Sequence, residues 1–315
     1  MPDKIKIAAI VGPTAGGKTA LSIALAKHFG GEIVSCDSMQ VYKRMNIGTA
    51  KPTAEEMDGV VHHMIEIAEP NIVYSCAEYV SDAKKVIEDI VSRGKLPIVC
   101  GGTGLYLDSL LRGGSFEVTD VDPEYRESLY NAAAEKGNEF VHSMLREIDP
   151  ESAEAIHPNN VKRVIRALEI YKTTGKTKTE LDENSRSNEG EYDALVVGLR
   201  YVDREVLYRR IDLRVDQMIR DGLEDEIRAL LAEGVFDSSG TATQAIGYKE
   251  LLGYIKGEMP YDDAVELLKR STRRYAKRQL TWFSNHSNVT WIDVEKQNNF
   301  EHILNIAKNL FNNFI

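Results

Sequence analysis

The feature that most constrains this chain is a glycine-rich segment close to its N-terminus. It reads GPTAGGKT over residues 12–19 and fits the spacing GxxxxGK followed by Thr. It directly follows the apolar run 5–11, which is typical of a buried parallel strand, and it opens a helical pattern over 18–29. In that setting the glycines let successive backbone N–H groups point inward, and the helix N-terminus adds partial positive charge. The segment therefore predicts a P-loop, a cradle for a di- or triphosphate.

We expect diphosphate contacts along the whole P-loop: Gly12, Pro13, Thr14, Ala15, Gly16, Gly17, Lys18 and Thr19. Lys18 supplies a full positive charge to phosphate oxygens, and the Thr19 hydroxyl can hold Mg²⁺. The motif does not name the reaction, because kinases, NTPases and transferases that expel diphosphate all need such a cradle.

Two further segments follow predicted strands at the same edge of a parallel sheet, where ligands bind. Asp37 follows the predicted strand 32–36, and its carboxylate can accept a proton from a nucleophile or hold Mg²⁺. The predicted strand 96–100 is followed by the GGTG turn of residues 101–104. Its three glycines indicate a close approach of backbone to ligand, and Thr103 can hydrogen-bond through its side chain. The sequence thus predicts one crevice lined by the P-loop, Asp37 and Thr103.

The order of elements predicts an α/β fold, a P-loop NTPase-like parallel sheet flanked by helices, because strands alternate with helices in the first third. We expect a P-loop catalytic core that comprises 1–119 and 192–315, with an all-helical insertion domain at 120–191. The core is predicted to contain further strands at 61–67, 194–201 and 289–294 and further helices at 77–92, 203–231, 261–283 and 300–314. The insertion is predicted to contain helices at 123–136, 138–147 and 160–174 and to end in a mobile polar linker at 175–191.

The formal net charge of −10 has the wrong sign for a polyanion partner, so such a partner must meet local basic patches. Residues 269–279 supply one patch, with Lys269, Arg270, Arg273, Arg274, Lys277 and Arg278. A second cluster comprises Lys162, Arg163 and Arg166. A charge run is usually a solvated face, but this density within an acidic chain favours phosphate contact.

Other features point to ordinary structural roles. The odd number of cysteines, with Cys36 and Cys100 in apolar runs, indicates buried reduced thiols of a cytosolic protein. No apolar run reaches the ~18 residues of a membrane span, and the N-terminus lacks a secretory pattern, so we expect a cytoplasmic protein. His62 and His63 are adjacent, and adjacent residues of a strand point to opposite faces, so we expect a structural pair rather than a zinc site.

The chain resembles the bacterial tRNA dimethylallyltransferases, also called tRNA isopentenyltransferases. Besides the P-loop, the matching segments occur in family order: SCDSMQVYKRMNIGTAKPT (35–53), HHMIEIAEP (62–70), YSCAEY (74–79), GGTGLYLDSLL (101–111), HPNNVKRVIRALEIYKTTGK (157–176), RIDLRVDQMIRDGLEDEI (210–227), QAIGYKEL (244–251) and RRYAKRQLTWF (273–283). The run DSMQVYKRMNIGTAKP is highly specific, and the matches span nearly the whole chain.

The resemblance implies an enzyme that transfers the dimethylallyl group of dimethylallyl diphosphate to a tRNA adenine. The acceptor is the exocyclic amine of the adenine 3′ of the anticodon, and diphosphate is released with Mg²⁺ as cofactor. The P-loop then grips the prenyl diphosphate, and Arg214 joins Lys18 there. Asp37 resembles the general base at the amine, and Thr103 the residue at the target adenine. We expect a monomer that binds the tRNA anticodon stem-loop.

The resemblance also implies that the insertion domain at 120–191 serves tRNA and that further tRNA contacts lie outside the P-loop. They are Asp37, Ser38, Met39, Gln40, Thr103, Tyr125, Val161, Lys162, Arg163, Val164, Ile165, Arg166, Gln244, Ala245, Ile246, Gly247, Tyr248, Lys249, Arg274, Lys277 and Arg278. Position 39 is often arginine in the family, so Met39 puts one polar contact in doubt. Tyr42 and Tyr106 are candidates to receive the extruded adenine, although such tyrosines more often belong to the core.

Three other functions remain open from the residues. A small-molecule kinase would use the same P-loop, with the insertion as a lid. A cytokinin-type enzyme would prenylate free adenine nucleotides, although the basic helices and the GGTGLY form favour tRNA. A non-catalytic tRNA-binding adaptor would leave Asp37 and Thr103 without a role.

Overall fold

The computed structural model describes residues 4–112, 122–187, 190–237, 240–286, 288–297 and 299–315. It divides into two compact units, Met1–Leu111 with Tyr192–Ile315, and Arg112–Glu191. The predicted domain boundary at 119–120 lies outside the described residues.

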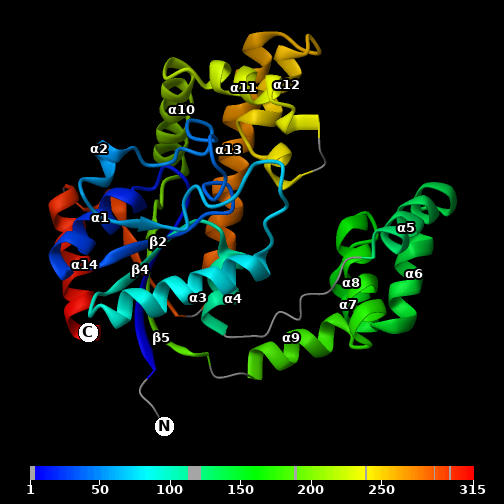
Figure 1. The fold of residues 1–315 in the computed structure, drawn as a ribbon, viewed down its shortest axis with the longest axis horizontal. Coiled ribbons are helices and arrows are strands. Elements are labelled where there is room, and N and C mark those ends of the chain that lie inside the picture. The colour runs from blue at the N-terminus through cyan, green and yellow to red at the C-terminus, as the bar shows by residue number, and fades with distance from the viewer. Residues whose placement is uncertain (1–3, 113–121, 188–189, 238–239, 287, 298) are drawn as a thin grey trace. The chain divides into compact units, whose positions relative to one another are not determined.

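A six-stranded parallel sheet forms the centre of the first unit (Figure 1). Its strands are β1 (Ile5–Val11), β2 (Glu32–Cys36), β3 (His62–His63), β4 (Pro97–Gly101), β5 (Tyr192–Arg200) and β6 (Val289–Asp293). Their order is β3-β2-β4-β1-β5-β6, and every pairing is parallel. β4 lies between β1 and β2 in the sheet. The segment after β1 leads to β2 on one side, and the segment after β4 leads to β5 on the other, so the direction of the connections changes between β4 and β1.

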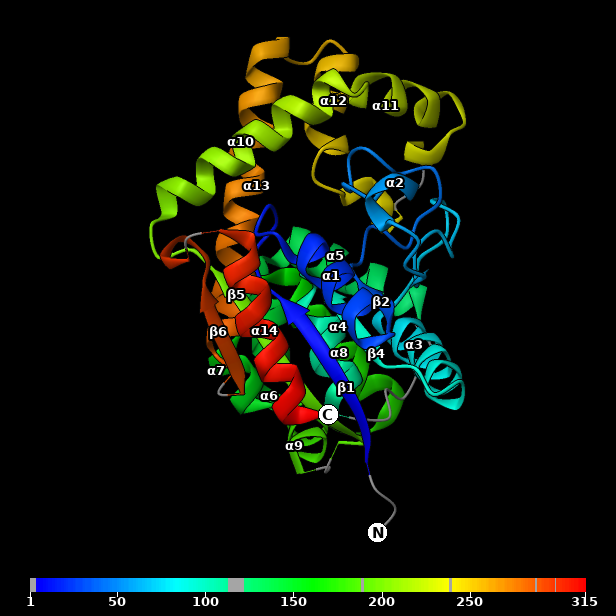
Figure 2. The same cartoon turned by 90° about the vertical axis from the view of Figure 1, so that its left-hand side faces the viewer.

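Helices cover both faces of this sheet, as the alternation of side chains along β1 requires. Ile7, Ala9 and Val11 face a core formed with α3 (Cys76–Ser92) and α4 (Gly104–Arg112). Ala8 and Ile10 face a second core formed with α1 (Lys18–Phe29) and α14 (Phe300–Phe314), which lie together in Figure 2. The predicted α/β class and helix-flanked parallel sheet are confirmed.

A group of helices follows β5. They are α10 (Arg204–Arg220), α11 (Leu223–Ala232), α12 (Tyr248–Ile255) and α13 (Tyr261–Ser284). The single long helix predicted over 203–231 is wrong, because Gly222 takes a left-handed conformation with φ of 96° and starts α11 in a new direction. The short elements of this unit are α2 (Ala54–Met57), η1 (Val235–Asp237), η2 (Thr241–Gln244) and η3 (Val294–Lys296).

The second unit is helical in its described residues. Its helices are α5 (Pro123–Lys136), α6 (Asn138–Ile148), α7 (Pro150–Ala155), α8 (Val161–Thr174) and α9 (Lys178–Ser187). The polar stretch predicted as a mobile linker contains α9 instead. Thr177 and Glu180 cap its first turn through reciprocal side-chain to backbone hydrogen bonds, and Asp149 accepts hydrogen bonds from the backbone N–H (3.0 Å) and hydroxyl (2.6 Å) of Thr179.

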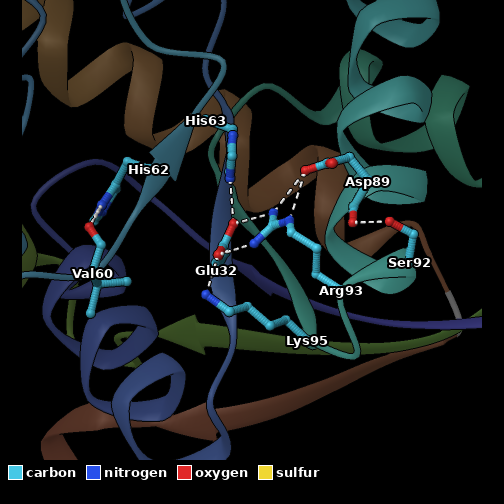
Figure 3. A network of polar contacts seen from close by, with 8 residues as sticks. All are labelled: Glu32, Val60, His62, His63, Asp89, Ser92, Arg93 and Lys95. Carbon is cyan, nitrogen blue, oxygen red and sulfur yellow. Dashed lines mark hydrogen bonds and ion pairs between the residues drawn. The ribbon is translucent and has the colours of Figure 1, made fainter.

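The strand predicted over 61–67 is wrong in length, because β3 pairs with β2 only at His62 and His63. Met64 and Glu66 have φ values of 62° and 57°, so the backbone turns away from the sheet there. His62 Nδ1 lies 2.9 Å from the Val60 carbonyl, and His63 Nε2 lies 2.7 Å from Glu32 (Figure 3). Both histidines therefore have contacts that hold this edge of the sheet.

Glu32 is the centre of the network in Figure 3. Its carboxylate is 3 % exposed and accepts two hydrogen bonds from Arg93, at 2.6 and 2.7 Å, and one from Lys95 at 2.6 Å. These hydrogen bonds, with that of His63, hold the pKa of Glu32 well below its usual range. The network joins the first residue of β2 to the turn between α3 and β4.

No helix among the described residues is long and apolar enough to cross a membrane. Cys36, Cys76 and Cys100 are free thiols, and burial raises the pKa of all three.

Candidate active site

Three loops leave the sheet at the carboxyl ends of neighbouring strands. The P-loop follows β1, the GGTG turn follows β4, and Asp37 follows β2. Val11 pairs with Gly101, and Cys36 pairs with the same glycine from the other side. The three predicted segments are therefore adjacent along one edge, where open parallel sheets bind ligands.

Positive φ values at two glycines and hydrogen bonds to the Pro13 carbonyl hold the P-loop in a compact turn. Gly12 and Gly17 have φ values of 140° and 94°, which favour glycine. The carbonyl of Pro13 accepts hydrogen bonds from the Gly16 N–H at 3.1 Å and from Lys18 Nζ at 2.8 Å. The lysine therefore points into the cradle, where a phosphate oxygen can replace the carbonyl as its partner.

Lys18 shares the crevice with Arg214 and Asp37. Burial lowers the pKa of Lys18 to about 8, and the positive charge of Arg214 adds to this effect while Asp37 and Cys100 oppose it. Burial also lowers the pKa of Arg214, and Asp37 again opposes the shift. Arg214 Nη2 donates to the Ala50 carbonyl at 3.4 Å. Two cations and one carboxylate, predicted from distant parts of the sequence, thus lie within electrostatic reach of one another.

Asp37 and Thr103 are connected through Ser38. Asp37 Oδ1 accepts hydrogen bonds from the N–H groups of Met39 and Gln40, at 2.9 and 3.3 Å, whereas its Oδ2 takes part in none of the described hydrogen bonds. Thr103 Oγ1 accepts from the Ser38 N–H at 3.0 Å and donates to the Ser38 hydroxyl at 3.3 Å. The turn that presents the carboxylate is therefore held against Thr103, with one carboxylate oxygen available.

The GGTG turn requires glycines because other protein atoms pack closely against it, and not because a ligand does. A Cβ at Gly101 would lie 2.0 Å from the Cys36 carbonyl oxygen, one at Gly102 would lie 2.0 Å from Gln279 Nε2, and one at Gly104 would lie 2.2 Å from the Trp282 ring. The expectation that these glycines admit a ligand is corrected, because neighbouring protein atoms already occupy the space.

The inner face of α13 supplies residues that the sequence analysis missed. Tyr275, Gln279 and Trp282 share that face. Gln279 hydrogen-bonds with Thr14 of the P-loop and Gly102 of the GGTG turn, the Trp282 indole N–H donates to Asp108 of α4 at 2.9 Å, and Tyr275 lies near Thr103. Burial raises the pKa of Tyr275 above its usual value. The available signal was their spacing of four and three residues, which places all three on one side of a helix. A further missed contact is that from Arg210 Nε to the Ala15 carbonyl at 3.0 Å.

The six cations of α13 divide into two groups. Lys269 pairs with Asp216 at 2.7 Å and Arg273 pairs with Asp212 at 2.7 Å, both on α10. Arg270, Arg274, Lys277 and Arg278 are exposed. The exposed group forms a basic outer face that suits phosphate contact, and it includes all three α13 residues implied by the resemblance.

Several predicted tRNA contacts have buried side chains. Ala245 and Tyr248 are 2 % and 0 % exposed, and the Tyr248 hydroxyl donates to Glu226 at 2.7 Å. Gly247 is buried and Ile246 half-buried, which leaves Gln244 and Lys249 exposed. We therefore correct the roles of Ala245 and Tyr248 from tRNA contact to packing.

The same division appears in the second unit. Val164 and Ile165 are each 1 % exposed and belong to its apolar core, so their side chains pack rather than contact tRNA. Among the predicted contacts on α8, Lys162, Arg163 and Arg166 are exposed and Val161 is half-buried. Tyr125 is half-buried beneath Lys172, whose Nζ lies 5.5 Å from the ring centroid.

Among the remaining predicted contacts, Ser38, Met39 and Gln40 are all half-buried. The Gln40 amide nitrogen donates to the carbonyls of Thr49 and Ala50, so this side chain holds the segment beside Arg214. Tyr42 and Tyr106 are 0 % and 5 % exposed and belong to the core, as tyrosines in such runs usually do.

The oxygen donors at this edge suit Mg²⁺. They are the Thr19 hydroxyl, in the first turn of α1, and the carboxylate of Asp37. Mg²⁺ is usually bound through one or two protein oxygens together with substrate phosphates and water. Since the described residues hold no cluster of three His, Cys, Asp or Glu suited to a metal, such an ion would be shared with the diphosphate.

Comparisons of the sequence and the fold with known proteins give consistent matches. The model of the IPP transferase family matches residues 40–286. A tRNA dimethylallyltransferase of Acetivibrio thermocellus is 50 % identical over 299 residues, with 95 % of each chain covered. Among solved structures, the tRNA isopentenylpyrophosphate transferase of Bacillus halodurans is similar with a TM-score of 0.74 and 45 % identity, over 98 % of this chain and 96 % of that one. A eukaryotic dimethylallyltransferase acting on tRNA has a TM-score of 0.80 at 31 % identity, over 99 % and 80 %.

Proposed function

The chain belongs to the IPP transferase family and is a prenyltransferase that acts on tRNA, and we propose that it modifies the adenine 3′ of the anticodon. In this reaction the dimethylallyl group of dimethylallyl diphosphate moves to the exocyclic amine of that adenine, and diphosphate leaves. We assign the reaction to the cytoplasm, because the tRNA substrate is found there.

The observation that carries the proposal is the meeting of Lys18, Arg214 and Asp37 at one edge of the sheet. A phosphotransferase can use the same residue types, with a carboxylate as base or metal ligand, so membership of the IPP transferase family is what favours prenyl transfer. Transfer to a weak nucleophile also needs a carboxylate opposite the leaving group, and Asp37 meets that need.

The leaving-group half would act by electrostatic stabilisation. As the allylic carbon–oxygen bond breaks, negative charge gathers on the diphosphate. Lys18, Arg214 and the N-terminus of α1 would stabilise this charge, with Lys18 exchanging the Pro13 carbonyl for a phosphate oxygen. Mg²⁺, held by the Thr19 hydroxyl together with the diphosphate, would supply further positive charge to the diphosphate oxygens.

The acceptor half would act by proton transfer. The lone pair of an adenine amine is delocalised into the ring, so the amine is a poor nucleophile. Oδ2 of Asp37 can accept the proton as the new carbon–nitrogen bond forms. Thr103, whose hydroxyl accepts a hydrogen bond from the Ser38 N–H beside Asp37, would hold the adenine.

The test is incubation of the purified protein with dimethylallyl diphosphate and an anticodon stem-loop RNA that carries the adenine. We expect equimolar release of diphosphate and a gain of one dimethylallyl group on that adenine by mass spectrometry. Parallel reactions with AMP as acceptor, and with labelled ATP and metabolites, test the two other enzymatic functions. Prenylation of AMP but not of the stem-loop, or phosphoryl transfer from ATP, would contradict the proposal.

A further inference from the structure

The side chain of Gln279 connects two loops of the active site. It lies on α13, is 4 % exposed, and accepts a hydrogen bond from the Thr14 N–H at 2.8 Å through Oε1. Its Nε2 donates to the Gly102 carbonyl at 3.0 Å. Thr14 belongs to the P-loop and Gly102 to the GGTG turn, so one amide group spans the gap between the loops that follow β1 and β4.

Only a side-chain amide suits this position among residues of similar size. The loops offer one backbone donor and one backbone acceptor, and an amide presents one acceptor and one donor group. A carboxylate would place an oxygen against the Gly102 carbonyl, and an apolar side chain would leave both backbone groups buried without a partner. The absence of a side chain at Gly102 is part of the same contact, because a Cβ there would lie 2.0 Å from Nε2.

The two loops carry the two halves of the reaction. The P-loop carries Lys18, which faces the diphosphate in the proposed function. Gly102 precedes Thr103, whose N–H donates to the Cys36 carbonyl at 3.1 Å and whose hydroxyl accepts from the Ser38 N–H. Both contacts flank Asp37, so the position of the GGTG turn determines the position of the carboxylate.

The same helix carries the basic outer face. Arg274, Lys277 and Arg278 are exposed within five residues of Gln279, while Gln279 is buried against the loops. A displacement of the helix that moved its outer face would therefore also move the amide that joins the loops.

We propose that Gln279 is a positioning residue that sets the separation between the leaving diphosphate and the accepting amine, and that it connects the tRNA-facing side of α13 to both. This inference rests on the proposed function. Gln279 does not touch the reacting atoms in it; it acts through Thr14, Gly102 and Thr103.

The first test is Gln279→Met, which keeps the length of the side chain and removes both hydrogen bonds. We expect the single-turnover rate to fall by roughly 10²-fold, because a displacement of about 1 Å between reacting groups has this effect. The affinities for stem-loop RNA and for dimethylallyl diphosphate, measured separately, should change by less than about threefold, since neither loses a contact of its own. Gln217→Met, on the exposed face of α10, is the matched control and should retain the full rate.

The second test pairs Gly102→Ala with Gln279→Ala. In the native background the added methyl group collides with Nε2, so Gly102→Ala should lower the single-turnover rate about as much as Gln279→Met. In the Gln279→Ala background that atom is absent, and the next neighbour of the methyl group, the Gly12 carbonyl, is 3.6 Å away. Gly102→Ala should then cause little further loss, and such non-additivity is the signature of a direct contact.

The outcomes separate the inference from the proposed function. Failure of the native enzyme to prenylate the stem-loop contradicts the function itself. A native enzyme that is active while Gln279→Met keeps a rate within about threefold overturns the inference alone, as does a loss seen only in the affinity for one substrate. If Gln279→Met does not fold, the paired variants decide, and equal losses from Gly102→Ala in both backgrounds overturn the inference.

Discussion

The two ends of β2 carry two carboxylates in opposite states. Glu32, at the start of the strand, is 3 % exposed, and Arg93, Lys95 and His63 occupy its oxygens. Asp37, just past the end of the strand, uses only Oδ1 in the described hydrogen bonds. A buried charge is therefore not by itself evidence of a functional site. The carboxylate with saturated partners holds the sheet, and the one with an available oxygen faces the ligand edge.

The largest effect should come from Asp37→Asn, which keeps the shape of the side chain and removes the base. We expect turnover on the stem-loop to fall by roughly 10²–10⁴-fold. The RNA affinity and the thermal midpoint should stay close to those of the native protein, because Oδ1 of asparagine still accepts the N–H groups of Met39 and Gln40. Rapid-quench measurement of single turnovers tests this. Near-native turnover would show that another group takes the proton.

The reciprocal change, Glu32→Gln, should act on stability instead. We expect the free energy of unfolding in urea to fall by about 2–3 kcal/mol, because removing a buried charge leaves its cationic partners unpaired. Arg93 and Lys95 are 37 % and 44 % exposed, so water replaces part of the lost interaction and limits the cost. The folded variant should retain its turnover, which makes it the matched control for Asp37→Asn. A large loss of turnover at full stability would break the contrast between the two ends of β2.

The contribution of Glu32 should depend on pH, by a smaller amount. Its pKa is held low in the folded protein, so its stabilising effect is complete above the ordinary carboxyl value of 4.5 and is lost as the pH falls below it. The difference in unfolding free energy between the native protein and Glu32→Gln should therefore shrink by about 1–2 kcal/mol between pH 6 and pH 3. A constant difference would mean that the carboxylate charge does not carry the effect.

The smallest effect should come from Thr103→Ala, which removes the hydroxyl beside Asp37. The hydroxyl makes two hydrogen bonds to Ser38, and since the longer one is readily replaced by water the loss should be close to that of one hydrogen bond, about 1 kcal/mol. We therefore expect a loss of roughly five- to tenfold in turnover, with little change in the midpoint of unfolding. Thr103→Ser should restore most of the rate, because its hydroxyl can still accept the Ser38 N–H. If serine fails to restore it, the methyl group of Thr103 matters more than the hydrogen bond.

The features that could be predicted from the sequence depend on residues that are close together along the chain. The P-loop is recognisable because its glycines, Lys18 and Thr19 are consecutive and follow a strand. Asp37 and the GGTG turn could be assigned to the same edge because the carboxyl ends of parallel strands meet there. Arg214 came only from the family resemblance, since nothing in its local pattern distinguishes it from other arginines of α10.

What escaped prediction depends on contacts between distant segments. Gln279 meets Thr14 across 265 residues, and Glu32 meets Arg93 across 61, and neither pairing leaves a periodic signal. The helix α9 also escaped, because its polar composition resembles that of a loop and its start is fixed by Asp149, thirty residues away. In each case the local sequence permits several structures, and a long-range hydrogen bond selects one.

The ion pairs between α13 and α10 have a consequence for the thermodynamics of RNA binding. A cation gains affinity for RNA from the entropy of the counterions that it displaces, and each phosphate neutralised adds about 0.7–0.9 to the slope of log K against log salt. Lys269 and Arg273 already have Asp216 and Asp212 as permanent counterions, so they have little to release. If α13 contacts tRNA as proposed, the slope for this helix should therefore be lower by about 1.4–1.8 than its six cations suggest, and the enzyme would respond less to the ionic strength around it.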